Sequence, residues 1–184
     1  MSVRGGLLSV LILLLASPSM SEPRQSNVSL MGQIVDLVPL HQETENDIPL
    51  VTRRKVRSVI GPDVEIRSMR DEYKRGELRM TVADFSVDYQ ANAIDVKING
   101  DKPVGFIEGN FSGWRLYFPN LSDEYLMGAV LHPRLRLEGM ENDAIKVQFK
   151  SIYINFDGLT AYPNTDGRPD GFRIEFVVAE PLTS

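Results

Sequence analysis

Apolar and polar residues alternate along most of the chain, which indicates β-strands. The alternating runs cover residues 64–67, 77–89, 93–98, 114–118, 134–137, 145–156 and 172–178. Successive side chains of a strand point to opposite faces, so each run offers one apolar face and one polar face. This pattern is typical of antiparallel sheets that bury one side. A shorter strand is expected at residues 34–38.

The alternation changes parity twice, at Ala83-Asp84 and at Lys150-Ser151. A parity change would turn the apolar residues outward unless one residue is looped out, as in a β-bulge. We therefore expect two long, bent strands. The predicted fold is all-β: an antiparallel β-sandwich or partly closed barrel.

Turn and cap residues add local detail. Asn99-Gly100 predicts a tight hairpin that joins a strand at 93–98 to one at 103–108, because both residues tolerate positive φ. One or two short helices are expected at 122–128, where Ser122 is a suitable N-cap, and at 68–75.

The first 21 residues have the layout of a secretory signal peptide. Arg4 precedes an apolar run at 7–16, and the small residues Ser19 and Ser21 occupy the −3 and −1 positions of a cleavage site. Cleavage after Ser21 predicts an exported, soluble protein, either periplasmic or secreted. The remaining chain divides into a flexible N-terminal segment at 22–49, which holds the first strand, and a single β-domain at 50–184.

The amino-acid composition excludes several kinds of covalent cross-link, metal site and catalytic residue. The 184 residues include no Cys and two His, so disulfides, thiolate metal sites, a cysteine nucleophile and a three-His metal site are excluded. The net charge of −5 argues against a nucleic-acid partner. An exported domain without disulfides is more typical of a bacterial envelope than of a small eukaryotic secreted protein.

No motif for catalysis stands out. The chain has neither a G-x-S-x-G elbow, nor a P-loop, nor a dinucleotide-type glycine fingerprint. Some pair among 25 acidic residues could hydrolyse a glycoside, but no spacing singles one out. We therefore predict a protein that is not an enzyme and needs no cofactor, with a glycan hydrolase as an alternative.

Residues 164–171 form the most pointed local motif, NTDGRPDG. Asn164, Asp166 and Asp170 could present oxygen ligands to Ca²⁺. The motif departs from an EF-hand loop in every register, and its D-G pairs also fit ordinary turns between strands. Calcium is thus a weak candidate beside the turn interpretation.

Trp114, Arg115 and Tyr117 lie in the densest aromatic cluster and are candidates for glycan binding. Trp114 shares its parity with Leu116 and Phe118, which predicts that it faces the core. Tyr117 shares the other face with Arg115 and is the better exposed candidate.

A basic segment offers a second candidate surface. Residues 53–79 contain nine basic and five acidic residues, and four of the basic ones are Arg53, Arg54, Lys55 and Arg57. Such asymmetry favours an anionic partner, for example an anionic lipid surface, although interleaved charges also form ordinary solvated faces.

The sequence therefore predicts an exported, non-catalytic β-domain that binds another envelope or extracellular component, either a protein or a glycan. A lipid-binding or lipid-carrying envelope protein is the alternative, and a glycan hydrolase is the second alternative.

Overall fold

The computed structural model describes residues 29–51, 55–75, 78–100, 102–121, 126–162 and 170–178. The predicted signal peptide lies outside these ranges. None of the described segments forms a helix with the length and apolarity needed to cross a membrane.

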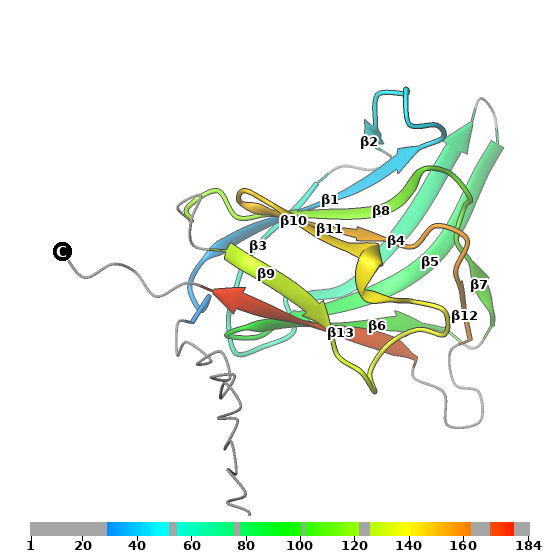
Figure 1. The fold of residues 1–184 in the computed structure, drawn as a ribbon. Helices are drawn as coiled ribbons and strands as arrows, with labels where there is room; N and C mark the ends of the chain where they lie inside the picture. Colours follow the sequence, from blue (N-terminus) through cyan, green and yellow to red (C-terminus); the bar gives the residue numbers. More distant parts are fainter. Residues whose placement is uncertain are drawn as a thin grey trace, which may run out of the picture.

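Two antiparallel sheets make up most of the fold (Figure 1). Sheet A has the order β10-β11-β8-β1-β2, and β3 also pairs with β1. Its strands are β1 (Ile34–Gln42), β2 (Leu50–Val51), β3 (Val56–Val59), β8 (Phe111–Tyr117), β10 (Ile145–Gln148) and β11 (Ser151–Asn155). The expected first strand is thus present and lies inside this sheet.

Sheet B has the order β4-β5-β6-β13-β9. Its strands are β4 (Ile66–Arg75), β5 (Leu78–Tyr89), β6 (Ala93–Asn99), β9 (Leu126–Leu131) and β13 (Gly171–Val178). Two short strands, β7 (Val104–Gly105) and β12 (Thr160–Ala161), pair only with each other. The described helical structure is one 3-10 turn, η1 (Asn142–Ala144).

The core lies between the two sheets, and its centre is aromatic. Trp114 of β8 contacts Phe85 of β5 edge to face, with ring centres 4.6 Å apart, and Phe156 at 5.1 Å. Phe172 of β13 packs on Phe156 at 5.5 Å. Aromatic rings in such offset and edge-to-face arrangements attract each other beyond the area they bury. Strands from both sheets therefore share one core, which confirms the predicted sandwich.

The sandwich is more closed on one side than on the other. The edge strands β9 of sheet B and β10 of sheet A contact each other, although they are not neighbours in either sheet (Figure 1). Among the described residues, no contact as extensive joins the opposite edges, which are β4 of sheet B and β2 and β3 of sheet A.

The first parity change is a bulge, as predicted. Asp71 pairs with Ala83 and Glu72 with Thr81, so Val82 is an extra residue in β5. The second parity change was predicted wrongly. Residues 145–156 do not form one bent strand, because Phe149 and Lys150 are the two loop residues of a hairpin between β10 and β11. A turn reverses the chain, so it changes parity without a bulge.

Three other local predictions were wrong. Residues 134–137 form no strand but turns and bends after β9, with Leu135 exposed and Leu137 buried. Residues 68–75 belong to β4, where pairing with β5 overrides the weak local preference for a helix. Asn99-Gly100 does not form a hairpin, because β6 lies between β5 and β13 and the next strand, β7, pairs with β12. In the second predicted helix, residues 122–125 lie outside the described ranges, and Leu126 begins strand β9.

Candidate functional site

The alternation of sheet A separates two sets of side chains. Trp114, Leu116, Ile152 and Ile154 point into the core and are fully buried. The intervening residues lie on the other side of the sheet, which we call the polar face of sheet A. It comprises Asp36, Val38, Leu40 and Gln42 of β1, Phe111, Gly113, Arg115 and Tyr117 of β8, Lys146 and Gln148 of β10, and Ser151, Tyr153 and Asn155 of β11.

The three residues predicted to bind a glycan lie on opposite faces of β8, as their alternation along the strand predicts. Trp114 is 0% exposed and is therefore not accessible to a ligand. Arg115 and Tyr117 are partly exposed on the polar face. The guanidinium carbon of Arg115 lies 5.0 Å from the ring centre of Tyr117, which is the geometry of a cation–π contact.

Two further rings share this face. Tyr153 is the cross-strand neighbour of Arg115, and its ring meets that of Phe111 edge to face at 6.2 Å. Gly113 lies between Phe111 and Arg115 along β8. A Cβ atom at Gly113 would collide with the carbonyl oxygen of Ile154, so the close approach of β8 and β11 excludes any side chain there. Phe111 and Tyr153 therefore meet beside a position without a side chain, and Tyr117 lies further along β8.

Two shallow depressions indent the polar face and meet at Gln148 and Tyr153. The amide depression, of about 270 Å³, is lined by the rings Phe111 and Tyr153, by Asp143, Ala144 and Lys146, and by the four amide residues Gln42, Asn110, Gln148 and Asn155. The arginine depression, of about 330 Å³, is lined by Arg115, Tyr117, Phe149, Lys150 and Ser151, in addition to the two shared residues.

Phe149 is unusual in both conformation and exposure. It is the first loop residue of the β10–β11 hairpin, has a positive φ of 51°, and leaves 68% of its surface exposed. Left-handed backbone costs a residue with a Cβ about 1–2 kcal/mol, and bulky residues adopt it rarely. The hairpin therefore holds an apolar ring in solvent, at the rim of the arginine depression.

Asp36 forms the strongest electrostatic cluster on this face. Its carboxylate accepts hydrogen bonds from Arg57 Nε and Nη2 at 2.7 and 2.8 Å and from Lys55 Nζ at 3.0 Å. The hydrogen bond from Arg57 is the main cause that lowers the pKa of Asp36 from 3.8 to about 2. Lys55 and Arg57 of the predicted basic surface are thus paired with a carboxylate of the protein itself. Arg53 and Arg54 lie outside the described residues.

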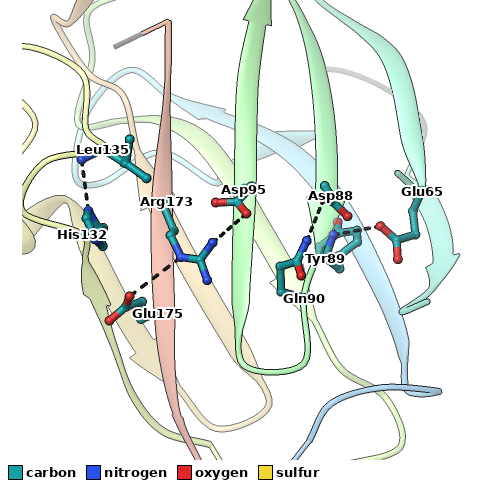
Figure 2. A network of polar contacts seen from close by, with 9 residues as sticks. All are labelled: Glu65, Asp88, Tyr89, Gln90, Asp95, His132, Leu135, Arg173 and Glu175. Carbon is teal, nitrogen blue, oxygen red and sulfur yellow. Dashed lines mark hydrogen bonds and ion pairs between the residues drawn. The ribbon is translucent and has the colours of Figure 1, made fainter. Parts of the chain in front are cut away.

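The outer face of sheet B has a different character, because its charged groups bind each other (Figure 2). Arg173 of β13 donates to Asp95 of β6 at 2.8 Å and lies 3.8 Å from Glu175. Glu65 accepts from the backbone N–H of Tyr89 at 2.8 Å. Among the sheet B side chains that the structure describes, the outer face thus carries ion pairs, in contrast to the rings and amides of sheet A.

The predicted calcium motif is described only at its end. Asp170 pairs with Lys97 at 3.2 Å, whereas Asn164 and Asp166 lie outside the described residues. Within the ranges that the structure describes, no group of three or more His, Asp or Glu side chains is close enough to hold a metal ion.

Both histidines have structural positions. His41 is buried in β1. His132 Nδ1 accepts hydrogen bonds from the backbone N–H groups of Arg134 and Leu135, both at 3.2 Å, and so holds the turn after β9 (Figure 2).

Sequence reasoning missed Phe111, Tyr153, Phe149 and Asp36. Tyr153 carried a usable signal, because it alternates with Ile152 and Ile154 and so had to share a face opposite the core. Asp36 carried none. Its partners lie 19 and 21 residues away, and only the pairing of β1 with β3 brings them together.

We predict that Asp36→Asn lowers the free energy of unfolding by about 2 kcal/mol at pH 7. The lowered pKa means that the stabilisation is complete above about pH 4 and is lost as the pH falls toward about 2. Urea denaturation of both chains across this range measures the effect. Asp63→Asn, at an exposed turn residue, is the control. A difference between Asp36→Asn and the parent chain that is the same at pH 2 and pH 7 would contradict the assignment.

We also predict a reversed order of stability at residue 149. At ordinary strand positions Ala is more stable than Gly by about 0.5–1 kcal/mol. At Phe149, the left-handed backbone should make the Gly variant more stable than the Ala variant by about 1 kcal/mol. Thermal or urea unfolding of the two variants checks the sign. A Phe149→Ala variant that is more stable than Phe149→Gly would mean that residue 149 does not have a left-handed backbone.

Comparison of the chain with protein-family models, with curated proteins and with solved structures finds no match. The physical chemistry of the polar face of sheet A is therefore the basis on which a function is inferred.

Proposed function

We propose that this chain is an exported, non-catalytic domain of a bacterial envelope that binds a glycan on the polar face of sheet A. The observation that carries the proposal is the grouping of Phe111, Tyr117 and Tyr153 with a set of amide side chains on one open sheet surface.

Sugars present two kinds of surface, and the polar face matches both. The C–H faces of a sugar ring are apolar and stack on aromatic rings, which bury a large area at low entropic cost. Sugar hydroxyls both donate and accept hydrogen bonds. Amide side chains do the same, and Gln42, Asn110, Gln148 and Asn155 line the amide depression beside Phe111 and Tyr153.

The shape of the site also suits a chain-like ligand. The two depressions are shallow, share Gln148 and Tyr153, and together follow the surface of β8, β10 and β11. A site of this shape can hold successive residues of a polymer, whereas small-molecule sites usually enclose most of their ligand.

A lipid carrier is less well supported. Carrying acyl chains requires a continuous apolar cavity. The centre of the space between the sheets is occupied by Phe85, Trp114 and Phe156, whose ring centres lie 4.6–6.3 Å apart.

A glycan hydrolase is likewise less well supported. It needs a carboxylic acid that stays protonated near neutral pH, which requires a raised pKa. On the polar face, Asp36 has its pKa lowered to about 2 by Arg57, which is the opposite direction.

A protein partner is a second candidate, and a separate surface favours it. Ile48, Leu50, Val51 and Val59, on or beside the edge strands β2 and β3, are all more than half exposed. An exposed edge with apolar side chains can pair with a strand of another chain.

We predict that Tyr153→Ala weakens glycan binding at least tenfold, because it removes the ring shared by both depressions. Native affinity electrophoresis of the full chain through gels that contain xylan, a mixed-linkage β-glucan, mannan or polygalacturonate measures the retardation. Tyr162→Ala, at an exposed tyrosine of a different depression, should leave the retardation unchanged. If no polysaccharide retards the parent chain, the glycan proposal is wrong.

Export has its own test. Expression of the full chain in a Gram-negative bacterium should give a periplasmic product whose intact mass starts at Glu22. Leu13→Arg places a charge in the apolar run and should retain the uncleaved chain in the cytoplasm. An uncleaved parent chain would contradict the proposed signal peptide.

A further inference from the structure

We infer that the glycan is acidic, and that Arg115 binds its carboxylate while Phe149 covers the sugar ring that carries it. This inference rests on the proposed glycan function and names the ligand class for the same surface.

The charge of the arginine depression carries the first step. Its lining residues include two cations, Arg115 and Lys150, and no Asp or Glu. Asp36 stands opposite Tyr117 in the β1–β8 register, but its carboxylate already accepts from Arg57 and Lys55 at 2.7–3.0 Å. Lys150 takes part in another interaction of the protein, so the positive charge that complements an anionic group is that of Arg115.

The geometry of Arg115 carries the second step. Stacking on Tyr117 holds the guanidinium against a ring and limits its rotation. Its Nε is buried and has no hydrogen-bond partner among the described residues. A planar guanidinium fork matches the two oxygens of a carboxylate. Because Nε is buried, a ligand carboxylate would meet the other nitrogens of the fork, in the depression that Arg115 lines.

Phe149 carries the third step. Its left-handed backbone and its exposure both cost stability in the free protein, and such strain is retained most often at functional sites. The ring lies at the rim of the depression that Arg115 and Tyr117 line. A sugar ring seated there would stack on Phe149 while its carboxylate meets Arg115.

A chemically matched pair of polymers tests the inference. Polygalacturonate and its carboxyl-reduced form have the same linkages and differ in the carboxylate. We expect the full chain to bind polygalacturonate at least tenfold more tightly than the reduced polymer in affinity electrophoresis or calorimetry. Arg115→Gln should remove this preference, and Arg115→Lys should restore part of it.

Two further variants separate charge from stacking and from folding. Phe149→Asn suits the left-handed backbone and should weaken binding of both polymers by a similar factor, so that the preference remains. Arg134→Gln, at an exposed arginine of another depression, is the charge-matched control and should bind as the parent does. Circular dichroism spectra of all variants identify any variant that is not folded.

The possible failures are distinguishable. Equal binding of the two polymers, or binding of the reduced polymer alone, would overturn the acidic ligand and leave the glycan proposal standing. Binding of no polysaccharide would overturn both. Equally tight, Arg115-dependent binding of polyglutamate or of vesicles rich in phosphatidylglycerol would mean that the surface recognises negative charge in general, which also overturns the inference.

Discussion

Packing of Trp114 between the two sheets determines which way β8 faces, and the candidate site depends on that orientation. The indole contacts Phe85 from sheet B and Phe156 from the chain beyond β11. A one-residue shift of β8 would put Arg115 into the core and Trp114 into solvent. Burial of the large apolar ring, and the cost of burying a guanidinium, therefore act together to present Arg115 and Tyr117 on the polar face.

The two outer faces of the sandwich use polar residues in different ways. On sheet B, Arg173 pairs with both Asp95 and Glu175, and Lys97 pairs with Asp170. On sheet A, Asp36 forms ion pairs with Lys55 and Arg57. Aromatic and amide side chains line the depression on another part of this face. Groups that already have partners gain little from a ligand. The amides of Gln42 and Asn110 also bind each other, so the rings and the partly exposed Arg115 favour the polar face of sheet A as the binding surface.

The hairpin between β10 and β11 shows why some local predictions failed. The parity change at Lys150-Ser151 is equally consistent with a bulge and with a two-residue turn, and Phe149 has none of the usual turn chemistry. At Asn99-Gly100, by contrast, the turn signal is strong but the hairpin is absent, because β13 pairs with β6 from a distant part of the chain. Long-range strand pairing therefore overrode the local signal at Asn99-Gly100, whereas at Phe149-Lys150 the local signal did not distinguish a turn from a bulge.

The alternation of apolar and polar residues was enough to determine the all-β class and the buried side of β6, β8, β11 and β13, and hence that Trp114 points inward and Arg115 and Tyr117 outward. That information is local, because a strand has a period of two whatever it pairs with. Strand order, the Asp36 cluster and the meeting of Phe111 with Tyr153 were decided only by the tertiary structure. Each of these features joins residues that are far apart in the chain, and the alternation pattern does not specify which strands pair with each other.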